Sequence, residues 1–258
     1  MTLRQPNIDR LLQLGLSGMA EALEEQRDIA DVDQLGFDDR LAMMIEREAE
    51  HRDHKSYLGH LRQAQLRIRA DVQDVDCRAG RGIARTTLTQ LAAGDWIRQG
   101  HNLILGGPTG SGKTFVACAL AHQACRQHQS VLYRRVPELV AALTGARDKG
   151  TLERLMGRLG RVSLLVLDDW GLQGFSAEGW RDLLEIVEAR HGRKSILVAS
   201  QIPVERWPKV IGEPTIADAV LDRIVHNAYR IELKGESQRK RYKPPPLDGG
   251  GDGNRAPA

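Results

Sequence analysis

The chain has 258 residues, of which 41% are hydrophobic, 28% charged and 4% aromatic, and its formal net charge is +3. This composition excludes a fully disordered chain, and the length suffices for one or two compact domains. No stretch approaches the ~18 uninterrupted apolar residues of a membrane-spanning helix, and residues 1–6 hold no apolar signal segment. The three cysteines, Cys77, Cys118 and Cys125, do not have the spacing of metal ligands. We therefore expect a protein of the reducing cytoplasm.

Residues 1–95 are expected to form a helical amino-terminal domain. Apolar residues recur at helical spacing from Ile8, Ser17 is a candidate cap for a second helix, and Asp38 marks the start of a third. Six basic residues between positions 47 and 69 outnumber the acids there. They indicate either a face that binds DNA or a partner, or an ordinary solvated helix face: Arg47, Arg52, Lys55, Arg62, Arg67 and Arg69.

Residues 96–243 alternate short apolar runs with helical patterns. This alternation is typical of an α/β fold with a doubly wound parallel sheet. Strands are expected at 101–105, 131–133, 162–167, 196–199 and 229–233, and helices at 112–128, 137–143, 178–190 and 215–227. The tail at 244–258 contains Pro-Pro-Pro and Gly-Gly-Gly runs and is expected to be disordered.

A phosphate-binding loop follows the first expected strand of this region. The octapeptide matches G-x-x-x-x-G-K-[ST] in full: Gly107, Pro108, Thr109, Gly110, Ser111, Gly112, Lys113 and Thr114. The glycines let several backbone N–H groups point at one phosphate, and the following helix directs its positive dipole end to the same place. We expect Lys113 to reach the β- and γ-phosphates of ATP and the Thr114 hydroxyl to bind Mg²⁺.

Two acids end the apolar run 164–167. Asp168 is the candidate Mg²⁺ ligand, and Asp169 is the candidate group that polarises the attacking water. Two adjacent acids could by themselves be a strand-end turn, but the nearby phosphate loop favours a catalytic role. In the same way Ser200 or Gln201, which follow another expected strand, could reach the γ-phosphate, since ligands bind beyond the carboxyl ends of parallel strands.

Together these segments resemble the IstB family of AAA+ helper ATPases, which act beside the transposase of a transposable element. The resemblance rests on the phosphate loop and four further segments, and it extends from the helical region to about Tyr242: Leu-Asp-Asp-Trp-Gly at 167–171, Ser-Gln-Ile-Pro at 200–203, Asp-Ala-Val-Leu-Asp-Arg at 218–223 and His226–Ser237. The family is similar to the DnaC helicase loader and to the initiator branch of AAA+ ATPases.

The resemblance implies ATP-dependent self-association on DNA, with each nucleotide between two subunits. Arg223 matches the position of an arginine that completes the neighbouring site and acts in trans. A local ion pair of Arg223 with Asp218 or Asp222 is the alternative. Seven basic residues between positions 223 and 243 either contact phosphate, lie at the subunit interface or form a solvated tail: Arg223, Arg230, Lys234, Arg239, Lys240, Arg241 and Lys243.

The sequence departs from the wider AAA+ pattern in two ways. Asp169 stands where the wider pattern has a catalytic glutamate, and its side chain is one methylene shorter, which favours a slow, switch-like ATPase. Only 35 residues follow Arg223, so the carboxyl-terminal helical lid is expected to be reduced or absent.

The sequence by itself is compatible with three functions. The first is an ATP-dependent factor that binds duplex DNA with little sequence preference, forms an oligomer on it and activates a transposase. The second is a DnaC-like loader of a replicative helicase. The third is a small-molecule kinase, against which the basic helical region argues. None of the three requires a membrane.

Overall fold

The computed structural model describes residues 4–26, 28–29 and 32–237, so the expected tail at 244–258 lies outside the described residues. All neighbouring strands pair in parallel, and the sheet order is β2-β3-β4-β1-β5. This arrangement confirms the predicted doubly wound sheet. Each of the five expected strands is present: β1 (Asn102–Gly106), β2 (Val131–Arg135), β3 (Leu164–Trp170), β4 (Ser195–Ser200) and β5 (Ala228–Glu232).

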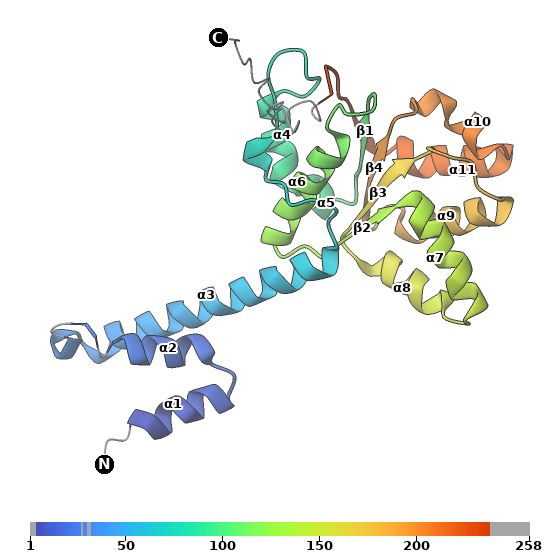
Figure 1. Cartoon of the computed structure of the whole chain (residues 1–258). Coiled ribbons are helices and arrows are strands. Elements are labelled where there is room, and N and C mark those ends of the chain that lie inside the picture. Colours follow the sequence, from blue (N-terminus) through green and yellow to red (C-terminus); the bar gives the residue numbers. More distant parts are fainter. Residues whose placement is uncertain (1–3, 27, 30–31, 238–258) are drawn as a thin grey trace, which may run out of the picture.

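Helices cover both faces of the sheet (Figure 1). One face packs against α4 (Arg85–Ala92), α5 (Asp95–Arg98) and α6 (Lys113–Arg126). The other packs against α7 (Val136–Asp148), α8 (Leu152–Arg161), α9 (Ala177–Arg190), α10 (Trp207–Ile211) and α11 (Pro214–Val225). Helices α8 and α10 were not predicted. Short 3₁₀ turns lie at Val32–Gln34, Val72–Asp74 and Val204–Arg206. In the described part of the chain no helix follows β5. No described helix is long and apolar enough to cross a bilayer.

The side chains of β3 alternate between the two helical layers, because successive residues of a strand point to opposite faces. Leu164 and Val166 belong to the core on the α6 side, whereas Leu165 and Leu167 belong to the core on the α9 side. The next residue in this alternation, Asp168, therefore points toward α6. The same period of two directs the Asp168 carboxylate toward Thr114, at the start of this helix.

Three amino-terminal helices form an arm that extends away from the sheet: α1 (Arg4–Gln13), α2 (Ser17–Glu25) and α3 (Phe37–Ala64) (Figure 1). The expected capping role of Ser17 is wrong, because Ser17 is the first residue of α2 and its side chain makes no capping bond. Instead, the backbone N–H groups of Gly18 and Met19 donate to Glu48 of α3, at 2.8 and 3.2 Å. A hydrogen bond from Arg52, together with these backbone donors, lowers the pKa of Glu48.

Apolar residues anchor the connection between the arm and the sheet. Ala64, the last residue of α3, is fully buried, and it belongs to the same hydrophobic cluster as Ala70, Leu88 and Trp96. Residues 64–97 thus pack as part of the sheet unit rather than as part of the arm. We therefore propose a domain boundary near residue 64, about thirty residues before the boundary at 95 that the change in sequence pattern suggests.

An aromatic cluster fixes the carboxyl end of β3. The rings of Trp180 and Trp207 lie 5.7 and 5.2 Å from the ring of Trp170, and Phe175 lies 5.2 Å from Trp180. All three tryptophans are buried. Because Trp170 directly follows Asp169, this packing holds the backbone of Asp169 in place.

Arg190 is fully buried at the opposite end of the sheet. Its guanidinium donates to the carbonyl oxygens of Leu159 and Ser195, both at 2.6 Å, and to that of Ser163 at 3.3 Å. Arg190→Met removes these donors while keeping most of the apolar volume, so we expect the free energy of unfolding to fall by about 3 kcal/mol. Urea unfolding would measure this loss, and an unchanged midpoint would contradict it.

Candidate functional site

The phosphate loop connects the carboxyl end of β1 to the amino terminus of α6. Gly107 and Gly112 have φ angles of +134° and +104°, which side-chain-bearing residues rarely adopt. A Cβ atom on Gly107 would also lie 2.3 Å from the carbonyl oxygen of Leu233. The loop therefore requires glycine here for both conformation and space, and its backbone opens toward the first turn of α6.

Lys113 lies against this loop and is 8% exposed. Its Nζ donates to the carbonyl oxygens of Gly107 and Pro108, at 2.7 and 2.9 Å. The ammonium group is thus held over the concave side of the loop. A phosphate bound there would meet a fixed positive charge together with the N-terminal dipole of α6.

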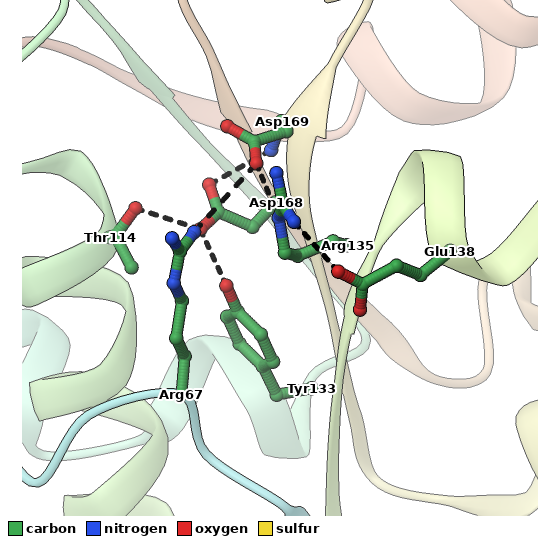
Figure 2. Close-up of polar contacts among 7 residues, drawn as sticks. All are labelled: Arg67, Thr114, Tyr133, Arg135, Glu138, Asp168 and Asp169. Atoms are coloured by element: carbon green, nitrogen blue, oxygen red, sulfur yellow. Dashed lines mark hydrogen bonds and ion pairs between the residues drawn. The ribbon is translucent and has the colours of Figure 1, made fainter.

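Asp168 joins the loop to the sheet. Its Oδ2 accepts hydrogen bonds from the Thr114 hydroxyl at 2.7 Å and from the Tyr133 hydroxyl at 2.6 Å (Figure 2). Burial and the adjacent carboxylate raise the pKa of Tyr133, so Tyr133 remains a neutral donor. A threonine hydroxyl beside a carboxylate is an oxygen donor set that suits Mg²⁺. The residues present therefore fit this ion.

Asp169 has a φ of +59°, an unusual value for a residue other than glycine. Its Oδ2 accepts a hydrogen bond from Arg135 Nε at 2.7 Å and lies 3.8 Å from Arg67 NH1. Arg135 also donates to Glu138 at 2.7 Å, and these two carboxylates raise its pKa. Two arginines from different parts of the chain therefore hold the candidate catalytic carboxylate (Figure 2).

The structure distinguishes between Ser200 and Gln201. The hydroxyl of Ser200 is buried and accepts a hydrogen bond from the Ile202 N–H at 3.0 Å, and its single proton is shared between the carbonyl oxygens of Trp170 and Ile202, at 3.0 and 2.9 Å. Gln201, in contrast, accepts a hydrogen bond from the Thr109 hydroxyl of the phosphate loop. Of the two candidates, only Gln201 contacts the loop, and Ser200 shapes the turn that presents it.

Arg223 lies near the amino end of β1, away from the phosphate loop of its own chain. The Asn102 side chain bonds the carbonyl oxygens of Arg223 and Ile224, both at 3.1 Å, and so fixes the end of α11. The Arg223 guanidinium pairs with Glu188 of α9 at 3.0 Å, rather than with either aspartate of its own helix. It is partly exposed at the surface.

Sequence reasoning missed several residues of the site. Tyr133 and Arg135 lie in β2, and the rule that ligands gather beyond the carboxyl ends of strands could have identified Arg135. In the sequence, Arg67 stands out only as one of the six basic residues between positions 47 and 69. An apolar cavity beside the loop had no recognisable signal, because irregular segments supply much of its lining: Asp74, Val75, Asp76, Arg81, Ile83, Ser111, Gly112, Phe115, Val116 and Leu233.

Comparison with known proteins agrees with this geometry. The family model described as "IstB-like ATP binding protein" matches residues 9–245. The chain belongs to this IstB-like family. An insertion sequence ATP-binding protein of Sinorhizobium fredii is 47% identical over 241 residues, covering 93% of this chain and 98% of the relative. The corresponding protein of insertion sequence IS21 in Pseudomonas aeruginosa is 30% identical over 92% of this chain and 88% of its own length.

Solved structures confirm the AAA+ fold of this IstB-like protein. DnaI has a TM-score of 0.57 at 25% identity, over 64% of this chain and 92% of its own. The DnaC helicase loader has a TM-score of 0.54 at 17% identity, over 64% of this chain and 97% of its own. The resemblance expected from the sequence is therefore confirmed: the chain is an ATP-binding, AAA+ protein of the insertion-sequence type.

Proposed function

We propose that this IstB-like protein is a Mg²⁺-dependent ATPase that assembles on duplex DNA and activates the transposase of its insertion sequence. The observation that carries the proposal is the grouping of Lys113, Thr114, Asp168 and Asp169 around one loop. The near-full-length similarity to insertion-sequence ATP-binding proteins supports the transposition context. It also favours this function over the loading of a helicase.

The chemistry follows from the position of each group. Lys113 would bind the terminal phosphates, while Thr114 and Asp168 would hold Mg²⁺, which neutralises charge on the transferring phosphoryl group. Asp169 would orient the attacking water once its carboxylate is released from Arg135. The adjoining cavity, with walls from Val75, Ile83 and Phe115 among others, offers an apolar surface for the nucleobase.

Arg223 would complete the active site of a neighbouring subunit. It lies near the amino end of β1, remote from its own loop, and its partial exposure leaves it accessible to a second copy of the chain. A guanidinium in this role stabilises the charge that develops on the γ-phosphate. Hydrolysis would then depend on self-association, which suits a switch that operates only in the assembled state.

Contacts to DNA phosphate would come from two surfaces. The first surface is the arm, where Arg47 already forms an ion pair with Glu25, and Arg52 with Glu48.

The second surface is α8, where three exposed arginines line one cavity with Gln63 of the arm: Arg154, Arg158 and Arg161. In the described chain none of these three pairs with a carboxylate, and burial, with a smaller contribution from the positive charge of Arg158, lowers the pKa of nearby Arg134. We therefore expect α8 to contribute more to phosphate binding than the sequence suggested.

The transposase contact would lie on the outer part of the arm. Several large apolar side chains are exposed there, including Phe37 at 78% and Ile45 at 55%. Exposed apolar residues grouped on a projecting element favour a protein partner. This assignment accounts for a surface that neither ATP nor DNA would cover.

Replacing the α8 arginines with alanine is expected to weaken binding to duplexes of unrelated sequence by a similar factor. In each single variant, the slope of log K against log salt concentration should fall by about one, because one phosphate contact is lost. Fluorescence anisotropy with labelled duplexes at several salt concentrations would measure both quantities. Arg181→Ala, which removes an exposed arginine of α9, is the matched control and should leave the slope unchanged.

The proposed function as a whole is tested by ATP turnover with duplex DNA, single-stranded DNA or no DNA, followed by addition of the purified transposase. We expect duplex DNA to stimulate turnover and the ATP-bound complex to stimulate strand transfer. Stimulation only by single-stranded DNA, with stable binding to a replicative helicase, would support the loader function instead. Absence of ATP binding would overturn both.

A further inference from the structure

Arg67 reaches the candidate active site from outside the strands and loops that form the rest of it. It lies three residues after the end of α3, and Gln65 between them adopts the left-handed conformation, with φ of 52°. The Arg67 side chain lines a cavity of about 290 Å³ together with Lys113 and Thr114 of the phosphate loop and both aspartates, Asp168 and Asp169. The segment that directly follows the arm thus contributes a cation to the candidate nucleotide site.

The contact of Arg67 with Asp169 is loose compared with that of Arg135. Arg67 NH1 lies 3.8 Å from Asp169 Oδ2, beyond hydrogen-bond length, whereas Arg135 Nε lies 2.7 Å from the same oxygen. The Arg67 side chain is 45% exposed and faces the cavity. Figure 2 places its guanidinium beside Asp168, Asp169 and Tyr133. Arg67, which also interacts with the Tyr133 hydroxyl, can therefore exchange Asp169 for another anion without breaking a short bond to this carboxylate.

The base of Arg67 is fixed to α3. Ala64 is fully buried, and the Tyr57 hydroxyl lies 2.6 Å from Nε2 of His122 on α6. Because α6 begins at Lys113, the last turns of α3 are packed against the same helix that carries the phosphate loop. Only two residues, Gln65 and Leu66, separate this anchored end from Arg67, so a shift of Arg67 and a shift of α3 are coupled.

Given ATP binding at the phosphate loop, as proposed above, we propose that Arg67 binds the γ-phosphate in cis. On ATP binding its guanidinium leaves Asp169 for a γ-phosphate oxygen, with which it forms a charge-assisted hydrogen bond. ADP lacks this group, so Arg67 remains with Asp169. Since Arg67 is joined to the buried end of α3, the seating of the arm becomes dependent on the nucleotide. By linkage, a ligand that repositions the arm changes the affinity for ATP but not for ADP.

The test compares the affinities of the full-length protein for ATP and ADP, measured with Mg²⁺ by isothermal titration calorimetry. Arg67→Ala is expected to weaken ATP binding about tenfold and to change ADP binding less than twofold, and Arg67→Lys should restore part of the ATP affinity. Arg193→Ala removes an exposed arginine near the amino end of β4 and serves as the matched control. Equal effects of Arg67→Ala on both nucleotides, or on neither, would overturn the proposal.

Hydrogen exchange supplies an independent readout of the arm. In the wild-type protein we expect residues 57–68 to be better protected with a non-hydrolysable ATP analogue than with ADP, and Arg67→Ala should abolish this difference. Persistence of the difference in the variant would overturn the coupling. A wild-type protein that binds neither nucleotide would overturn the proposed function itself, whereas normal ATP binding by Arg67→Ala would overturn only the role of Arg67.

Discussion

Lys113→Ala is expected to reduce ATP affinity and turnover at least about 100-fold, because it removes the fixed positive charge that faces the terminal phosphates. Nζ of Lys113 is held by the carbonyl oxygens of Gly107 and Pro108, so it is already positioned before a phosphate arrives. Calorimetry would measure the loss of nucleotide affinity, and a coupled assay of phosphate release would measure the loss of turnover.

The fold should survive this change, because the hydrophobic clusters on both faces of the sheet are separate from the lysine side chain. The melting temperature of Lys113→Ala without nucleotide should therefore stay close to that of the wild type. Lys149→Ala, which removes an exposed lysine after α7, is a control of equal charge. Full ATPase activity of Lys113→Ala would exclude this loop as the catalytic site.

Arg223→Ala is expected to lower turnover about 1,000-fold while nucleotide binding is retained. The physical reason is that the guanidinium would stabilise charge in the transition state of the neighbouring site and would contribute little to the ground state. Steady-state turnover at saturating ATP, beside a direct binding measurement, would separate the two effects. A parallel loss of binding would contradict the assignment.

Mixing variants tests whether Arg223 acts between subunits. Lys113→Ala subunits retain Arg223, and Arg223→Ala subunits retain a complete phosphate loop, so a mixture should hydrolyse ATP faster than either variant alone. Glu188→Gln breaks the ion pair that Arg223 makes within its own chain and should leave turnover nearly unchanged. An inactive mixture, or a Glu188→Gln variant as slow as Arg223→Ala, would indicate that Arg223 only stabilises α9 and α11.

The sequence by itself determined the sheet and the phosphate loop, since both depend on local patterns. Continuous apolar runs, whose side chains point alternately to the two faces of the sheet, set the strands, and the spacing of Gly107, Gly112 and Lys113 marks a loop that only glycine backbone geometry permits. The direction of Asp168 toward α6 also follows from this alternation. These features were predictable because each is specified within a few neighbouring residues.

Only the tertiary structure decided which distant residues meet. Glu48 caps α2 from a position thirty residues away from Gly18, and Arg135 and Arg67 both approach Asp169 from other elements. Such contacts depend on strand order and on how α3 is seated, and no local spacing encodes them. The sequence thus specified the chemical groups for binding ATP, whereas packing at the ends of α3 and β2 decided which cations lie beside the Asp169 carboxylate.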